Sequence, residues 1–403
     1  MALMPVAEAL EAVLDGAAAL GTEMVALDDA CHRVLARDIA ALRSQPPSAM
    51  SAMDGYAVRA SDVAEVPTRL RVIGEIAAGR PFAGALGPGE ALRIFTGGVV
   101  PDGADAVVIQ EDTTAENGTV VVHVSVRAGR HVRVAGVDFR EGDVLLRAGR
   151  RLSDRDLSLA AAMNHPALPV SRRPKLAIFA TGDELVMPGT TPGPGQIVYS
   201  NGYALRALAR SEGAEVVDLG LVGDTVEATV AAVRSARAAG ADILVSTGGA
   251  SVGDHDVVQQ ALEAEAVTMA FWKIAMRPGK PMMHGRLGAM RVLGLPGNPV
   301  SSYVCAFLFM APLIRALSGR SDVRHMAEQA VLGADLPAND QRHDYLRARL
   351  ASGADGRQIA TPVLQQDSSL LAKLSEAGAL ILRPPLAPPA KAGSPCDILK
   401  LPL

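Results

Sequence analysis

The sequence contains few aromatic residues and has no excess of basic ones. Only 3% of its 403 residues are Phe, Trp or Tyr, which argues against the stacking platforms that bind single-stranded nucleic acid. The formal net charge of −4 likewise differs from the strongly positive charge of proteins that coat nucleic acid. We therefore expect no nucleic-acid partner.

Cysteines are also scarce. Cys31, Cys305 and Cys396 are odd in number, far apart and without C-x-x-C spacing, so the sequence predicts neither a disulfide framework nor a thiolate zinc site. The N-terminal segment carries Glu8 and Glu11 and no basic run ahead of an apolar core, so we expect no secretory signal. Together these features predict a cytoplasmic protein.

Long hydrophobic runs are missing as well. The longest strongly apolar stretch, residues 303–314, is too short to span a bilayer and contains Pro312, so we interpret it as a buried helix and expect no membrane partner. Apolar residues still make up 49% of the chain, which is ample for several cores. At roughly 150 residues per domain, the length is typical of about two to four domains.

Patterning divides the chain into segments. Residues 49–140 alternate in short apolar runs separated by Gly, Pro, Asp and Asn, which predicts a small β-rich domain. Residues 321–403 carry short strand candidates divided by Gly and Pro, which predicts a C-terminal β domain. Residues 1–48 plus 141–173 remain as a mixed α/β N-terminal domain, in which Ser153 is a good N-cap for a helix over 154–163.

Residues 174–320 alternate apolar strands with helical stretches. This alternation predicts a doubly wound α/β domain with a parallel sheet covered on both faces. The expected strands cover 176–180, 215–219, 243–246 and 292–295, and the expected helices cover 203–211, 226–239, 256–265 and 301–317. The predicted fold class is therefore a central parallel α/β domain flanked by β-rich domains.

Ligands of open parallel sheets bind at the carboxyl ends of the strands. The four loops that follow the predicted strands are 181–184, 221–224, 247–254 and 296–299. All four contain Gly, which lets a ligand approach the backbone, and the first three also contain a carboxylate. Gly-rich turns before helices suit phosphate, and carboxylates suit a hard divalent cation. The set predicts a phosphate-and-magnesium site, although a carboxylate in any single loop is equally explained as a helix cap. No P-loop and no strand-associated G-x-G-x-x-G occurs.

A basic stretch lies between two of these loops. Lys273, Arg277 and Lys280 fall within eight residues that also contain Pro278. We interpret this stretch as an anion receptor, and a solvated basic turn is the alternative.

An ordered set of motifs resembles a known family. It comprises Met-Asp-Gly-Tyr-Ala at 53–57, Thr-Gly at 96–97, Gly-Ala-Asp-Ala-Val-Val at 103–108, Arg133 with 136–139, Thr-Gly-Asp-Glu-Leu at 181–185, Gly-Gly-Ala-Ser-Val-Gly-Asp at 248–254, Pro-Gly-Lys-Pro at 278–281 and Leu-Pro-Gly-Asn-Pro-Val-Ser at 295–301. Spread over nearly the whole chain, this set resembles the molybdopterin molybdenumtransferases, the molybdenum insertases of cofactor biosynthesis that are related to the insertase domain of gephyrin.

The resemblance implies an elongated homodimer of four-domain subunits, in which residues 1–48 plus 141–173 contribute to dimerisation. It implies an active cleft between the central domain of one subunit and the small β domain of the other. The implied substrates are adenylylated molybdopterin and molybdate, the products are molybdenum cofactor and AMP, and the reaction depends on Mg²⁺. The molybdopterin adenylyltransferase of the preceding step is a possible partner.

The resemblance also assigns roles to individual residues. The catalytic residues it implies are Asp54, Asp138, Glu184, Asp224 and Asp254, of which Glu184, Asp224 and Asp254 would hold Mg²⁺. The substrate-binding residues it implies are Thr96, Gly97, Arg133, Thr181, Gly248, Gly249, Ser251, Gly253, Lys273, Arg277, Lys280, Pro296, Asn298, Pro299, Ser301, Arg342 and Ser368. Arg277 stands where many members carry Lys.

Two alternatives remain open from the sequence. One is an adenylyltransferase-like enzyme that acts on molybdopterin and consumes ATP. The other is a non-catalytic scaffold that keeps the fold and binds partners.

Overall fold

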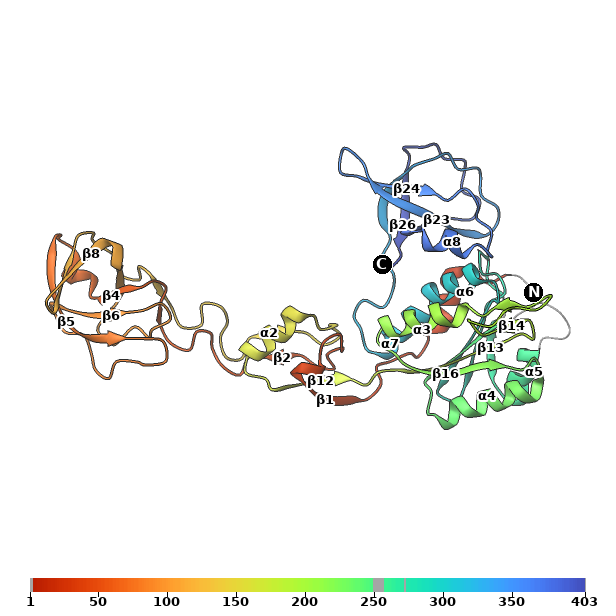
Figure 1. Cartoon of the computed structure of the whole chain (residues 1–403), viewed down its shortest axis with the longest axis horizontal. Coiled ribbons are helices and arrows are strands. Elements are labelled where there is room, and N and C mark those ends of the chain that lie inside the picture. Colours follow the sequence, from red (N-terminus) through yellow and green to blue (C-terminus); the bar gives the residue numbers. More distant parts are fainter. Residues whose placement is uncertain (1–2, 249–256, 272, 403) are drawn as a thin grey trace.

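The computed structural model describes residues 3–248, 257–271 and 273–402. The molecule is elongated, with folded parts at both ends and a narrower middle part between them (Figure 1). A small β part lies at one end, and the central α/β part lies at the other with a C-terminal β structure beside it (Figure 1). This architecture confirms the predicted fold class.

The small β part contains one six-stranded mixed sheet in the order β7-β4-β6-β5-β9-β8. Because successive side chains point to opposite faces of a strand, Val108 joins one buried core while its neighbour Val107 joins another. The elements are β4 (Gly55–Val58), η2 (Ala60–Val63), β5 (Thr68–Ile76), β6 (Glu90–Ile94), β7 (Ala106–Ile109), η3 (Gln110–Asp112), β8 (Thr113–Glu116) and β9 (Thr119–Val122).

The middle part consists of antiparallel strand pairs and one helix. The strands pair as β1 (Thr22–Ala26) with β12 (Ala167–Ser171), β2 (Ile39–Ala40) with β11 (Val144–Leu146), and β3 (Met50–Ser51) with β10 (Val132–Arg133), and a short turn η1 (Leu27–Asp29) follows β1. Helix α2 (Asp154–Ala162) begins after Ser153, whose hydroxyl accepts from the Asp156 N–H while the Asp156 carboxylate accepts from the Ser153 N–H. This reciprocal pair is a capping box and confirms the predicted N-cap.

The chain enters and leaves the small β part side by side. The β2–β11 pair, a bridge between Gln45 and Phe139, and the β3–β10 pair follow one another along these two passages. We call residues 39–51 and 132–146 the connecting ribbon. It forms the end of the middle part that leads into the small β part (Figure 1).

The central part is a six-stranded sheet in the order β16-β13-β17-β21-β20-β18. Its strands are β13 (Lys175–Thr181), β16 (Glu215–Val222), β17 (Ile243–Thr247), β18 (Thr268–Phe271), β20 (Met283–Leu287) and β21 (Met290–Leu295), and a separate parallel pair is formed by β14 (Leu185–Val186) and β15 (Ile197–Val198). The sequence analysis expected a parallel sheet, but this sheet is mixed, because β20 runs antiparallel to both β21 and β18. Gly288, with φ of +62°, lies in the two-residue turn between β20 and β21 and suits such a hairpin.

Helices cover both faces of the central sheet. They are α3 (Asn201–Ser211), α4 (Val226–Ala238), α5 (Val257–Ala264), α6 (Pro299–Cys305), a π turn η4 (Ala306–Met310) and α7 (Ala311–Leu317). Ile178 of β13 packs in the core that contains α3 and α6–α7, whereas its neighbour Phe179 packs in the core that contains α4 and α5. Strands buried on both faces explain the unbroken apolar runs in the sequence.

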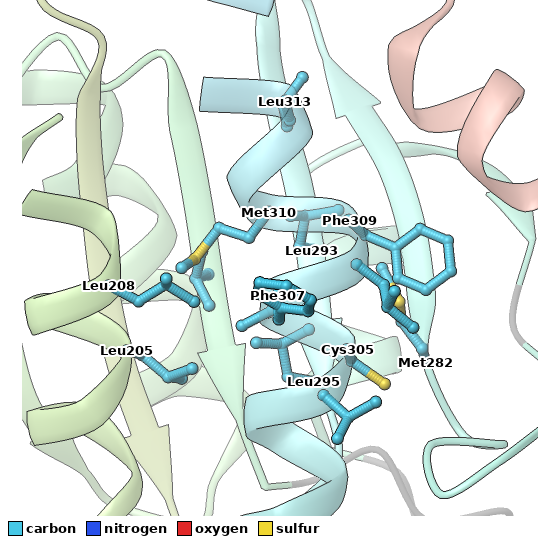
Figure 2. Packing of buried hydrophobic residues seen from close by; sticks show 14 of the residues in the cluster. Leu205, Leu208, Met282, Leu293, Leu295, Cys305, Phe307, Phe309, Met310 and Leu313 are labelled. Atoms are coloured by element: carbon cyan, nitrogen blue, oxygen red, sulfur yellow. The ribbon is translucent and has the colours of Figure 1, made fainter. Parts of the chain in front are cut away.

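The segment Pro299–Leu317 forms one 19-residue helical stretch, close to the helix expected over 301–317. Among the described residues it is the one helix long and apolar enough to cross a membrane, and 83% of its most apolar window is buried inside the protein. Phe307, Met310 and their neighbours lie against Leu205 and Leu208 of α3 (Figure 2). The stretch is a core helix, as predicted.

The first helix joins this same core. Helix α1 (Val6–Leu14) buries Ala9 and Val13, both 0% exposed, with the residues of α7. The start of the chain therefore packs on the central part, which differs from the grouping of residues 1–48 expected from the sequence.

The C-terminal sheet has the order β19-β23-β24-β22-β26-β25, and an additional β23–β25 pairing closes five of its strands into a barrel. Its elements are β22 (Glu328–Leu332), β23 (His343–Ser352), β24 (Gln358–Pro362), α8 (Leu371–Ser375), β25 (Ala379–Arg383) and β26 (Pro395–Lys400). The sixth strand, β19 (Met276–Arg277), comes from the basic stretch of the central part and pairs with β23. The C-terminal barrel is thus attached directly to the segment predicted to bind anions.

Candidate functional site

A pocket of about 840 Å³ lies at the carboxyl ends of the central strands. All four loops that follow the predicted strands contribute to its lining, and Glu184, Asp224, Gly248 and Asn298 are examples. The site residues that the sequence analysis named and that line this pocket are Thr181, Glu184, Asp224, Gly248, Pro296, Asn298 and Pro299. Gly249, Ser251, Gly253 and Asp254 lie outside the described residues.

Glycine allows two of these loops to approach each other closely. Gly248 has a φ of +85°, and a Cβ atom there would lie 2.3 Å from the carbonyl oxygen of Thr181. A Cβ on Gly297 would lie 3.7 Å from the Gly248 Cα. Asn201, at the start of α3, donates from Nδ2 to the Gly297 carbonyl at 2.7 Å. The floor of the pocket is therefore backbone, which leaves room for a bulky anion.

Two carboxylates face this backbone floor. Glu184 and Asp224 are exposed and line the pocket, and neither side chain makes an ion pair or hydrogen bond with any residue that the structure describes. The Asp224 N–H donates to Asp183 Oδ1 at 3.4 Å, which links the first and second loops. Both carboxylates are free to accept a cation.

Two buried hydroxyls at the pocket also lack partners. Thr181 Oγ1 and Tyr199 OH belong to side chains that are 2% exposed, and neither forms a hydrogen bond with a described residue. Burial raises the pKa of the Tyr199 phenol, so the hydroxyl stays protonated. Unsatisfied buried polar atoms are rare in native structures; both oxygens are enclosed by protein, and the Tyr199 hydroxyl lies against Gly202 of α3.

The donor set fits magnesium held together with phosphate. Among the described residues, no three His, Cys, Asp or Glu side chains lie close enough to hold a metal by themselves. Mg²⁺ usually takes one or two carboxylates and completes its shell with water and substrate phosphate. Glu184 and Asp224 beside a glycine-lined floor meet that requirement.

The predicted basic stretch borders the pocket only in part. Pro281 lines the pocket, and the adjacent Lys280 is exposed and without an ion pair to any described residue. Lys273 is half-buried, and its carbonyl accepts from the Met4 N–H at 3.1 Å. Neither lysine is part of the pocket lining.

Arg277 lies away from the lining and is already paired. It bonds to the Asp344 carboxylate, whose side chain is 4% exposed, and lies 3.4 Å from Asp340. The hydrogen bond that Arg277 donates to Asp344 raises the pKa of Arg277. Its guanidinium therefore fastens β19 to the C-terminal barrel, and this contact differs from the expected one with an anion.

The C-terminal barrel reaches the pocket through one loop. Ser369 lines the pocket, and the carbonyl of the neighbouring Ser368 accepts from the Val300 N–H at 3.0 Å. Ser301 is buried in the first turn of α6. Arg342 pairs with Asp340 at 2.8 Å and is not in the lining.

The remaining predicted residues lie at the other end of the molecule. The N–H and hydroxyl of Thr96 both donate to Asp54 Oδ1 at 2.7 Å, and these bonds hold the pKa of Asp54 below its usual value. Gly97 donates to the Ser51 carbonyl at 2.9 Å, and β10, which contains Arg133, pairs with β3. We call Asp54, Thr96, Gly97 and Arg133 the Asp54 corner.

Asp138 lies in the connecting ribbon, where its N–H donates to the Gln45 carbonyl at 3.0 Å. Within one chain, the small β part that carries the Asp54 corner is separated from the central part by the whole middle part (Figure 1).

Several pocket residues were not predicted from the sequence. Tyr199, Ser200 and Asn201 line the pocket between the first central strand and α3, and Ser369 lines it from the C-terminal barrel. Polar residues directly before the predicted helix at 203–211 were a usable signal, because helix N-termini present free N–H groups. No comparable feature of the sequence pointed to Ser369.

Comparisons with known proteins agree with this architecture. Residues 4–164 match the family model described as MoeA N-terminal region (domain I and II), 177–316 match the probable molybdopterin binding domain, and 329–401 match the MoeA C-terminal region (domain IV). The molybdopterin molybdenumtransferase of Bacillus subtilis is 37% identical over 389 residues, which cover 94% of this chain and 90% of that protein.

The protein of the same name from Nostoc sp. is 43% identical over 305 residues, which cover 74% of this chain and 70% of the relative. The crystal structure of a molybdopterin biosynthesis MoeA protein from Pyrococcus horikoshii matches with a TM-score of 0.86 and 30% identity, and the match covers 99% of each chain. The chain therefore belongs to the molybdopterin molybdenumtransferase family.

Proposed function

We propose that this chain transfers molybdenum from molybdate to adenylylated molybdopterin and releases AMP, giving molybdenum cofactor. The observation that carries this proposal is the pocket lined by Glu184 and Asp224, two carboxylates unpaired within the described residues, and by a glycine floor between Thr181 and Gly248. Family models that match the regions on both sides of the molybdopterin binding domain favour this activity over that of an adenylyltransferase.

The residues of the pocket suit the pyrophosphate of such a substrate. The floor at Gly248 and Gly297 has no side chains that would keep a phosphate away. Lys280 beside the pocket, together with Lys273, would lower the repulsion between two anionic substrates.

Magnesium, when bound, would polarise the pyrophosphate so that AMP leaves as a stabilised anion. Glu184 and Asp224 would hold it, and Asp254 completes the proposed set. Because the Glu184 and Asp224 side chains are exposed and unpaired within the described chain, they bind a cation without first breaking a protein contact.

We further propose that the active cleft is shared by two copies of the chain. The Asp54 corner and the pocket lie at opposite ends of one chain (Figure 1), so the corner can act only on another copy's pocket. Exposed apolar side chains flank both surfaces: Val134 and Val137, 57% and 61% exposed, follow Arg133, and Ile197, 56% exposed, lines the pocket. Arg133 and Asp138 would then face the substrate from the partner, while Ser301, Arg342 and Ser368 support the pocket's rim.

A cytoplasmic location, and transfer of the substrate from a molybdopterin adenylyltransferase, complete the proposal. The absence of disulfide-forming cysteine pairs agrees with a reducing compartment.

Replacement of one carboxylate tests this proposal. Asp224→Asn keeps the shape and removes the charge, so we expect AMP release from adenylylated molybdopterin, molybdate and Mg²⁺ to fall at least about a hundredfold. Asp218→Asn, in strand β16 ahead of the loop that carries Asp224 and outside the pocket lining, is the matched control and should keep most of the activity. Unchanged AMP release in the Asp224 variant would reject the proposed site, and ATP consumption by the native chain would favour the adenylyltransferase.

A further inference from the structure

A second hollow, of about 450 Å³, lies where the turn between β11 and α2 meets residues 321–322. We call it the arginine hollow, and its charged lining residues are Arg147, Arg150, Arg151, Arg155, Asp156 and Asp322. None of them lines the pocket described above.

The walls of the arginine hollow are fixed to each other by the backbone. Gly149 has a φ of +79°, and its carbonyl accepts from the Ser321 N–H at 3.0 Å. A Cβ on Gly149 would lie 3.1 Å from the Ser321 nitrogen. The turn therefore lies directly against the segment that leads to the C-terminal barrel, and the hollow is a preformed feature of this junction.

Both carboxylates in the lining are already occupied. Asp156 pairs with Arg150 at 2.8 Å and also caps α2. Asp322 pairs with Arg320 at 2.5 Å. Arg147 is paired as well, with Asp38 at 2.7 Å, so the arginine charges left over in the hollow are those of Arg151 and Arg155.

Two arginines are left to bind something else. The guanidinium of Arg155 is exposed and makes no ion pair or hydrogen bond within the described part of the chain. Arg151 donates from Nη2 to the Ser211 carbonyl at 2.8 Å, but its buried Nε has no partner among the described residues. Burial, and after it the charge of Arg320, lowers the pKa of Arg151, while Glu212 and Asp322 act in the opposite direction.

The chemistry of the lining selects the class of ligand. Its members include no aromatic ring, and Ala148 is the one apolar side chain among them, so neither a nucleobase nor an acyl chain would gain a contact surface. Planar arginine forks bind tetrahedral oxyanions through paired N–H groups. We propose that the arginine hollow binds an inorganic tetrahedral oxyanion (phosphate, sulfate or molybdate) at a site separate from the active pocket.

Calorimetric titration of the full chain with each of the three anions, at constant ionic strength set with NaCl, tests this proposal. We expect saturable binding that Arg155→Gln weakens about tenfold or more, because a charge-assisted hydrogen bond is lost, and that Arg151→Gln added to it weakens further. The control is Arg69→Gln, an exposed arginine paired with Glu116 in the small β part, which should leave binding unchanged. The anion that binds most tightly identifies which of phosphate, sulfate and molybdate is the ligand of the hollow.

Two outcomes would overturn the proposal. They are equal binding in the native chain and the Arg155 variant for all three anions, and equal loss of binding in the Arg69 control. The test does not depend on the proposed function: AMP release by the Arg155 variant should stay unchanged, because the hollow shares no lining residue with the pocket.

Discussion

At the scale of single residues, the site depends on positions where a side chain is missing. Gly248 is held in a left-handed conformation, and its Cα faces the Thr181 carbonyl so closely that a methyl group would overlap it. Gly240, which follows α4, also has a positive φ, +68°, but a Cβ there would meet nothing within 4 Å. A side chain at Gly240 would meet only backbone strain, whereas a side chain at Gly248 would meet both backbone strain and a steric clash.

Alanine substitution at these two glycines gives the first prediction. Gly240→Ala should cost about 1 kcal/mol of unfolding free energy from the positive φ alone and leave AMP release unchanged. Gly248→Ala must also push the Thr181 loop aside, so we expect AMP release to fall at least about tenfold. Urea unfolding and AMP release on both variants are the measurements, and full activity of the Gly248 variant would contradict the interpretation of the pocket floor.

At the scale of elements, β20 carries a buried ionisable group into the central core. His284 is 0% exposed, and its Nδ1 N–H donates to the Val292 carbonyl at 3.0 Å across the β20–β21 pair. Burial lowers the pKa of His284 to about 4. The imidazole is therefore neutral in the folded protein over most of the pH range.

A pH dependence of stability follows. The pKa of His284 is lower in the folded state than the ordinary value near 6.5, so between about 6.5 and 4 the unfolded chain binds the additional proton. Stability is full above that range and falls as the pH drops through it, with a slope of up to about 1.4 kcal/mol per pH unit. Urea midpoints between pH 7 and 4 measure it. His284→Gln should reduce this slope. The control His123→Gln, at an exposed position, should leave it unchanged. Equal slopes in the native chain and the His284 variant would refute the argument.

The sequence predicted most elements of the central part for a physical reason. β13 and β17 are buried on both faces, so their residues form the continuous apolar runs that distinguish such strands. β18 and β20 were missed because Thr268–Phe271 and Met283–Leu287 are short, and no helix among the described residues separates β18 from β20 or β20 from β21. The parallel pattern therefore gave no indication of an antiparallel edge, although Gly288 marks its turn.

Candidate site residues were predictable where strand ends determine their position. Glu184 and Asp224 follow strands directly, and their loops meet in one pocket. Arg277 was harder to place, because its charge suits an anion and a buried carboxylate equally, and only the fold shows Asp344 beside it. The role of Asp254, outside the described residues, stays a prediction.

At the scale of the whole molecule, the two groups of proposed site residues are far apart. The Asp54 corner and the pocket lie on opposite sides of the middle part (Figure 1). If two copies share each cleft, one copy supplies Asp54 and the other supplies Asp224. Two inactive variants can then restore each other.

Mixing Asp54→Asn chains with Asp224→Asn chains gives the corresponding prediction. A mixed dimer has one cleft with both native carboxylates and one with neither. After unfolding and refolding together, random pairing should recover about a quarter of native AMP release, while each variant alone stays inactive. Light scattering measures the dimer in each sample. Recovery at the level of the single variants would show that each cleft belongs to one chain.

The connecting ribbon makes the small β part an insertion whose two ends leave the middle part together. Because residues 39–51 and 132–146 are paired along their length, adding or deleting matched residues in both passages would change the reach of the small β part while leaving its sheet intact. The length of the connecting ribbon would then set the distance between the Asp54 corner of one copy and the pocket of the other. If two copies share each cleft as proposed, a change in ribbon length would alter the width of the cleft, and so the size of the substrate it encloses, without altering a residue that touches that substrate.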